Sequence, residues 1–291
     1  MSKLVFLSGD FSSGSTLLWL LFRKTGAFHT LYEPLHERLR EYLIYPLRSY
    51  EHHFFSENYF AEYKGYKEVF KLHSDAWGRS DFYLAKDDDG TELYRYLSYI
   101  IGMSFSRQER VALQFNRIAF KLGWLRKNFP EVPIIHIYRE PEKQWDSIVR
   151  RSQSHHGRED VGQNSVNFSG MGVSNWCNQL QEQFPELRAE NSNTGYERYL
   201  KLYNLSLQQH NQYADLSVKY EDLVSNFSEE CEKIFDLIDY PADIEYLSQF
   251  VVPTAKHKPL SNDKKKIDRM VYEKIDRLGS LYARAKLRLI L

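Results

Sequence analysis

The sequence has few cysteines and no excess of either charge. Among its 291 residues only Cys177 and Cys231 are cysteine, and they lie far apart, so a disulfide framework and a cysteine metal site are both excluded. Reduced thiols are typical of a cytosol-like compartment, and we expect a cytoplasmic protein. The 39 basic residues equal the 39 acidic ones, which argues against binding nucleic acid through a general positive field.

Long apolar runs are also lacking. The first apolar run, Leu4–Leu7, is too short for a signal peptide, and no stretch approaches the ~20 apolar residues of a membrane-spanning helix. We therefore expect no integral membrane segment. Hydrophobic residues make up 42% of the chain and aromatic residues 15%, enough for the core of one large domain. The prediction is a single domain, 1–291, with helical or loop insertions at about 28–106 and 152–200.

Apolar runs alternate with helical patterns along the chain. Strands are predicted at Leu4–Leu7, Ile118–Leu122, Ile134–Tyr138 and Leu216–Tyr220, with helices from Thr16 to about Lys24 and from Pro141 onward. Residues 28–106, rich in Tyr, His and charge, predict helices and loops that cover the site rather than build the sheet. This alternation predicts an α/β fold of three layers with a central parallel sheet, whose ligands lie at the carboxyl ends of the strands.

The stretch SGDFSSGST follows the first predicted strand and precedes the first predicted helix. Backbone N–H groups from Ser13 to Thr16 would form an anion-binding nest at the helix start, and Gly14 would allow close approach. The hydroxyls of Ser12, Ser13, Ser15 and Thr16 add donors. A loop for nucleoside triphosphates needs Lys where Ser15 stands, so a P-loop kinase or NTPase is the weaker alternative.

A second cluster of donors follows the predicted strand Ile134–Tyr138. Arg139 ends that strand, and Ser147 and Arg151 share one face of the next helix because they are four residues apart. Arginine grips phosphate with two parallel hydrogen bonds, so these three side chains could converge on one phosphate. Alternatively, the acidic residues nearby neutralise both arginines on a solvated helix.

Together these segments resemble the sulfotransferases that use 3′-phosphoadenosine 5′-phosphosulfate (PAPS). That family carries [KR]-S-G-[ST]-[ST] after its first strand, matched here by Ser12–Thr16, and later R-x-P with a Ser eight residues after the Arg, matched by Arg139, Pro141 and Ser147. VKYEDLV at 218–224 resembles the family's Y-E-D-L segment. LYEPLHE at 31–37 resembles the Glu-Pro segment of its carbohydrate-modifying branch.

The resemblance implies a P-loop-like sulfotransferase fold and transfer of a sulfuryl group by in-line displacement, without a metal. It places the 5′-phosphosulfate of PAPS on Ser12–Thr16 and the 3′-phosphate on Arg139, Ser147 and Arg151. Tyr220 would approach the nucleotide, and Lys256 or Lys258 would close over it. The acceptor stays open among small molecules, glycans and lipids, and a non-catalytic nucleotide-binding or glycan-binding relative is a further alternative.

The sequence departs from the family at Ser12, which stands where the family has Lys or Arg. Another cation must then stabilise the leaving oxygen. Lys121 is the first candidate, and the others are Arg117, Lys71 and Lys258. For the base, Glu33 is the leading candidate, with His73 and His36 as alternatives.

Overall fold

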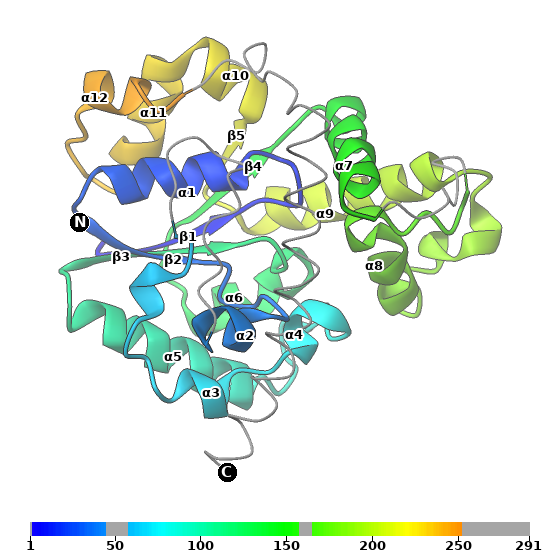
Figure 1. The fold of residues 1–291 in the computed structure, drawn as a ribbon, viewed down its shortest axis with the longest axis horizontal. Helices are drawn as coiled ribbons and strands as arrows, with labels where there is room; N and C mark the ends of the chain where they lie inside the picture. Colours follow the sequence, from blue (N-terminus) through cyan, green and yellow to red (C-terminus); the bar gives the residue numbers. More distant parts are fainter. Residues whose placement is uncertain (1, 45–57, 157–164, 252–291) are drawn as a thin grey trace.

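The computed structural model describes residues 2–44, 58–156 and 165–251 (Figure 1). Within these residues, five parallel strands form one sheet in the order β2-β3-β1-β4-β5. The strands are β1 (Leu4–Ser8), β2 (Phe28–Tyr32), β3 (Arg110–Phe115), β4 (Ile134–Tyr138) and β5 (Leu216–Lys219). The predicted α/β fold with a central parallel sheet is confirmed.

The order of the strands places β1 at the centre of the sheet. Leu4 pairs in register with Val111 on one side, and Phe6 pairs with Ile134 on the other. The chain builds one half of the sheet through β2 and β3 and then crosses to β4 and β5, so the direction of winding reverses at β1. The carboxyl ends of β1, β3 and β4 therefore border the crevice where open α/β sheets bind ligands.

Helices cover both faces of the sheet (Figure 1). One face carries α1 (Ser15–Lys24), α10 (Tyr220–Ser225), α11 (Phe227–Asp236) and α12 (Ile244–Ser248), which share a core with β1 and β4. The other face carries α5 (Thr91–Phe105) and α6 (Leu122–Asn128), with the short α2 (Leu39–Ile44), α3 (Val69–Leu72) and α4 (Ala76–Arg79) beyond them. No helix of the described residues is long and apolar enough to cross a membrane.

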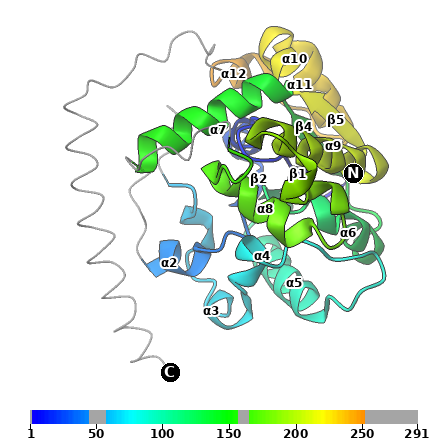
Figure 2. The same cartoon turned by 90° about the vertical axis from the view of Figure 1, so that its right-hand side faces the viewer.

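A third group of helices lies at one end of the sheet. Figure 2 shows α7 (Pro141–His156), α8 (Val173–Leu180) and α9 (Gly195–Tyr213) on this side of the molecule. They have their own apolar core, which includes Trp145, Trp176 and Tyr199. Because this core also packs against Phe11 of the loop after β1, the three helices form a wall of the crevice.

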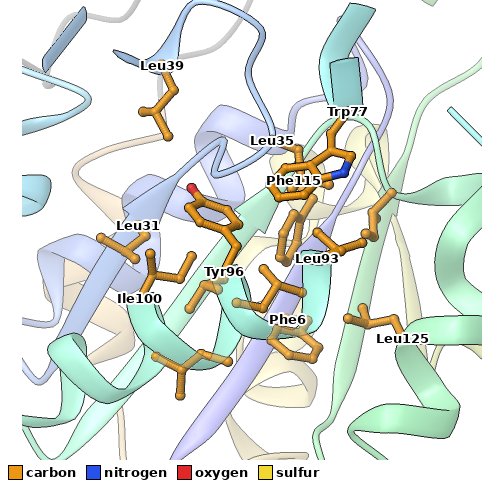
Figure 3. Packing of buried hydrophobic residues seen from close by; sticks show 14 of the residues in the cluster. Phe6, Leu31, Leu35, Leu39, Trp77, Leu93, Tyr96, Ile100, Phe115 and Leu125 are labelled. Carbon is orange, nitrogen blue, oxygen red and sulfur yellow. The ribbon is translucent and has the colours of Figure 1, made fainter. Parts of the chain in front are cut away.

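The core below the sheet fixes the segment that follows β2. Figure 3 shows Phe6 and Phe115 from the strands packing against Leu93 and Tyr96 of α5. The Tyr96 hydroxyl donates a hydrogen bond of 2.7 Å to the Pro34 carbonyl. This contact anchors the backbone next to Glu33, a candidate site residue.

Two predictions about the strands are wrong. Residues 118–122 form a turn of 3₁₀-helix, Ala119–Lys121, and the start of α6, while the strand lies earlier at Arg110–Phe115. A short apolar run is compatible with a buried strand and with a buried helical turn, because both can bury every residue. Here residues 118–122 are all buried, and 119–122 are helical. Residues 28–106 also contribute to the sheet, because β2 lies at its edge.

Candidate functional site

The loop between β1 and α1 is built around Gly14. Its φ of 102° lies in the left-handed region, and a Cβ atom there would stand 2.3 Å from Cδ2 of Tyr220. Glycine is therefore required both for the backbone conformation and for the contact with the tyrosine ring. Ser12 also has a left-handed φ, 63°, which gives the loop its second sharp bend.

The start of α1 offers unused hydrogen-bond donors. Gly14 caps the helix without a side-chain acceptor, and no acidic residue lies in the first turn. The hydroxyls of Ser12 and Ser13 are buried and have no hydrogen-bond partner among the described residues. Orphaned donors at a helix N-terminus fit an anion such as a phosphate or sulfate.

Ser15 and Thr16 face other residues of the protein. The Ser15 hydroxyl is buried and donates a hydrogen bond of 2.8 Å to Asn116 Oδ1, while Thr16 Oγ1 lies 2.9 Å from the Tyr32 hydroxyl. These two contacts tie the loop to the ends of β3 and β2. In a triphosphate-binding loop a lysine at the position of Ser15 points to the ligand. Here the Ser15 side chain points to Asn116 instead.

Tyr220 joins three of the predicted motifs. It begins α10, directly after β5, and its ring covers Gly14. The Arg139 guanidinium lies 4.8 Å from the centre of the same ring, and Arg139 Nε is 3.5 Å from Glu221 Oε1. The predicted loop, the arginine after β4 and the tyrosine after β5 are thus brought together.

Arg151 approaches the same place from α7. Burial lowers the pKa of its guanidinium, and the positive charges of Arg139 and Arg150 lower it further, while Tyr32 acts in the opposite direction. Two arginines close enough to influence each other form an electropositive region suited to a phosphate. Ser147 lies one turn before Arg151 on α7 and is partly exposed.

Glu33 is the centre of a buried polar network. It has a left-handed φ of 41°, a strained conformation for a residue with a side chain, which costs on the order of 1–3 kcal/mol. One carboxylate oxygen accepts a hydrogen bond of 2.5 Å from Asn116 Nδ2, and the other is ion-paired with Arg117. Because Asn116 also accepts from Ser15, Glu33 is linked to the anion-binding loop through a single side chain.

Arg117 is the cation closest to this network among the described residues. It pairs with Glu33 and, at 2.8 Å, with Glu37, and its guanidinium lies 4.8 Å from the centre of the Phe11 ring in the loop. Burial raises the pKa of Glu33 although Arg117 acts against that rise. The side chains of both residues are less than a tenth exposed, so their charges depend on each other.

The remaining candidates lie elsewhere. Lys121, expected at a strand end, lies in the 3₁₀ turn, fully buried, with Nζ 3.1 Å from Asp81 Oδ1, and burial lowers its pKa. Lys71 is exposed and pairs with Glu68. His73 packs against Trp77 and Tyr96, and burial lowers its pKa to about 4. Lys256 and Lys258 lie outside the described residues.

His36, the third candidate for the base, is buried beside this network. Its Nδ1 accepts a hydrogen bond of 3.0 Å from the Arg38 backbone N–H. Burial lowers its pKa well below the usual range for histidine, with Arg117 acting in the same direction. The imidazole is therefore neutral at pH 7, and Nδ1 already has a donor.

Two site residues were missed by the sequence analysis. Asn116 directly follows β3, and a correct assignment of that strand would have placed it at the carboxyl edge beside the loop. Asp10 lies within the loop, where its Oδ2 accepts a hydrogen bond of 2.6 Å from the Ser206 hydroxyl. A carboxylate in an anion-binding loop is itself an unusual feature that the sequence displays.

No group of three or more His, Cys, Asp or Glu side chains within 2–44, 58–156 and 165–251 could hold a metal ion. Among these described residues, Arg117, Arg139 and Arg151 and the start of α1 supply positive charge at the crevice.

Comparisons with known proteins find similar solved structures only. No family model matches the sequence, and no curated protein matches it. A sulfotransferase from Mycobacterium avium has a TM-score of 0.48 and 14% identity, covering 89% of this chain and 69% of that one. A sulfotransferase from Alicyclobacillus acidocaldarius has a TM-score of 0.41 and 13% identity, covering 97% and 95%. The sulfotransferase domain of the Synechococcus olefin synthase has a TM-score of 0.40 and 17% identity, covering 88% and 81%.

Proposed function

We propose that this protein is a sulfotransferase that takes PAPS as donor and transfers its sulfuryl group to a hydroxyl or amine of an acceptor. The observation that carries the proposal is the position of Tyr220, which lies between Gly14 of the anion-binding loop and Arg139. Two elements from distant parts of the sequence, each proposed to bind an anionic group, therefore meet at one crevice, which supports a nucleotide with two separate anionic groups as the ligand.

In this proposal the loop binds the 5′-phosphosulfate. The buried hydroxyls of Ser12 and Ser13 and the backbone N–H groups at the start of α1 are its donors. Arg139, Ser147 and Arg151 bind the 3′-phosphate through charge-assisted hydrogen bonds. The predicted closure by Lys258 lies outside the described residues and stays a prediction.

Arg117 replaces Lys121 as the proposed substitute for the missing loop cation. It lies against Phe11 of the loop, whereas the Lys121 ammonium contacts Asp81, which lies outside the loop. Positive charge near the bridging oxygen of the donor stabilises the charge that develops as this oxygen leaves. Glu33 holds Arg117 and Asn116 in place, and its role as a base stays a prediction.

The loop argues against one of the rival functions, and a transfer assay tests the other. A kinase or NTPase needs a lysine that reaches the terminal phosphates, and the corresponding Ser15 side chain donates inward to Asn116. A non-catalytic binding protein would hold the nucleotide without consuming it, which only a transfer assay decides. A cytoplasmic location and an acceptor among small molecules, glycans or lipids are part of the proposal.

The test is a calorimetric titration of 3′-phosphoadenosine 5′-phosphate into the wild type, Arg139→Ala and Lys143→Ala. Lys143 is the control because it lies on α7, more than half exposed, and pairs with Glu140. We expect binding to the wild type and the control and a loss of at least tenfold in affinity for Arg139→Ala. The proposal would be contradicted if the wild type bound ATP with Mg²⁺ more tightly than 3′-phosphoadenosine 5′-phosphate. It would also be contradicted if all three proteins bound 3′-phosphoadenosine 5′-phosphate with equal affinity.

A further inference from the structure

Gln144 connects the helix that carries Ser147 and Arg151 to the anion-binding loop. Gln144, Ser147 and Arg151 share one face of α7, because they are spaced by three and then four residues. Gln144 is 2% exposed, and its Nε2 donates a hydrogen bond of 2.8 Å to the Phe11 carbonyl of the loop. This contact links the element proposed for the 3′-phosphate to the element proposed for the 5′-phosphosulfate.

The oxygen of the Gln144 amide has unused capacity to accept a hydrogen bond. A carbonyl only accepts hydrogen bonds, so the contact with Phe11 fixes the orientation of the amide, with Nε2 toward the loop. Its Oε1 is buried and has no hydrogen-bond partner among the described residues, and the same holds for the hydroxyl of Ser13 in the loop. Buried polar atoms are nearly always satisfied, by protein or by ordered water.

A small hollow lies beside these two groups. It is bordered by Asp10, Ser13, Gln144 and Tyr203, among others, and it has room for about one water molecule. The Tyr203 hydroxyl already donates a hydrogen bond of 2.9 Å to the Arg139 carbonyl, whereas Asp10 accepts a hydrogen bond at only one carboxylate oxygen, Oδ2. The Asp10 carboxyl, the Ser13 hydroxyl and Gln144 Oε1 are therefore three groups at this hollow with hydrogen-bonding capacity to spare.

These groups match the hydrogen-bonding pattern of one water molecule. Water donates two hydrogen bonds, which Gln144 Oε1 and the Asp10 carboxylate can accept, and it accepts one, which the Ser13 hydroxyl can donate. Buried waters typically make about three such hydrogen bonds. A hard cation such as Mg²⁺ or Ca²⁺ fits less well, because it takes about six or more oxygen ligands and the hollow has no room for water ligands beside it.

We propose that Gln144 is a positioning residue that holds the two anion-binding elements of the donor site at a fixed spacing. It contacts the loop directly at Phe11 and, through one bound water, at Asp10 and Ser13. This inference rests on the proposed sulfotransferase function. A site held at the spacing of its ligand binds both anionic groups with little cost for ordering the protein. Gln144 should therefore matter for a ligand that spans both elements more than for one that occupies a single element.

The test compares the affinities of three nucleotides by calorimetry. The bisphosphate 3′-phosphoadenosine 5′-phosphate spans both elements, whereas adenosine 5′-phosphate and adenosine 3′-phosphate each occupy one. The proteins are the wild type, Gln144→Met, which keeps the length of the side chain and removes its hydrogen bonds, and Lys143→Met, a control at a more than half exposed position of α7. We expect Gln144→Met to weaken binding of the bisphosphate about tenfold and of each monophosphate by no more than about threefold. Lys143→Met should leave all three affinities unchanged.

Gln144→Glu keeps the shape of the side chain and is the second variant, in case Gln144→Met does not fold. Its carboxyl can donate to the Phe11 carbonyl only while it holds a proton, and burial favours the protonated form. We therefore expect its bisphosphate affinity, relative to the wild type at the same pH, to recover as the pH falls from about 8 to about 5.5. The titratable groups around the hollow are the same in both proteins: Asp10, His136, Tyr138 and Tyr203. A ratio of affinities that does not change with pH would contradict the role of the contact with Phe11.

Three outcomes would overturn this inference. Unchanged bisphosphate affinity in Gln144→Met would remove the positioning role, and equal losses for all three nucleotides would show that Gln144 supports the fold alone. A crystal structure of the wild type should show one water between Gln144 Oε1, Asp10 and Ser13, and a direct hydrogen bond between Gln144 and Ser13 without that water would overturn the bridge. Failure of the wild type to bind the bisphosphate would instead contradict the proposed function itself.

Discussion

Replacing Asp10 by Asn should make the protein more stable above pH 6. The carboxyl is largely removed from water, accepts one hydrogen bond of 2.6 Å from Ser206, and forms no ion pair with the described residues. Burial raises its pKa to about 6, whereas in the unfolded chain an aspartate has a pKa of ~3.9. The folded protein therefore keeps this proton over a pH range in which the unfolded chain has lost it.

The size of the effect follows from the two pKa values. A difference of about two pH units corresponds to about 3 kcal/mol of unfolding free energy. Because the folded pKa is the higher one, this stability is present below pH ~4 and is lost as the pH rises through about 6. An asparagine does not ionise and still accepts a hydrogen bond from Ser206, so Asp10→Asn avoids the loss.

The assay is urea unfolding of the wild type, Asp10→Asn and Asp87→Asn at pH values from 5 to 8. We expect the unfolding free energy of Asp10→Asn to exceed that of the wild type by up to about 3 kcal/mol at pH 8, with about half of this difference remaining at pH 5. Asp87→Asn is the control at an exposed aspartate that pairs with Lys127, and it should show no such gain. The reasoning about the buried carboxyl would be refuted if the unfolding free energies of the wild type and Asp10→Asn changed with pH in the same way. It would also be refuted if Asp10→Asn were the less stable protein at pH 8.

Three further substitutions test the network around the loop. Gly14→Ala should cost about 1–3 kcal/mol of stability through its left-handed φ and weaken bisphosphate binding at least tenfold in calorimetry, since the methyl group meets Tyr220; unchanged binding would contradict the loop assignment. Arg117→Met should cost about 3–5 kcal/mol by leaving Glu33 unpaired, and the double variant Arg117→Met/Glu33→Gln should recover most of it in urea unfolding. Asn116→Ala should cost about 1–3 kcal/mol, because Ser15 and Glu33 both lose a buried partner; a neutral effect would show that the network is dispensable.

Much of the fold and of the anion site could be predicted because local signals were strong. β1 and β4 are almost wholly apolar and buried, as the sequence indicates for central parallel strands. Gly14 lies in the loop that joins β1 to α1 and Arg139 directly follows β4, so their positions in the fold follow from the strand assignment.

The missed parts lacked a clear local signal in the sequence. β3 contains Gln114, which is fully buried and donates a hydrogen bond of 2.7 Å to Asn116 Oδ1. A polar residue within a short apolar run weakens the pattern that predicts a buried strand. Lys121 is the first candidate from the sequence because it lies at the end of a predicted strand and because a lysine near this point is common in the family that the motifs resemble. Nothing local reveals its pairing with Asp81, forty residues earlier. The choice between two cations was therefore a matter of tertiary packing.

The most direct test of the donor site compares the affinities of the wild type for 3′-phosphoadenosine 5′-phosphate and adenosine 5′-phosphate, which differ only in the 3′-phosphate. Charge-assisted hydrogen bonds contribute about 1.5–3 kcal/mol each, so even one such bond predicts a preference of at least tenfold for the bisphosphate. The preference should disappear in Arg139→Ala. Equal affinities for the two nucleotides in the wild type would mean that Arg139 and Arg151 hold no 3′-phosphate, and the proposed use of PAPS would be contradicted.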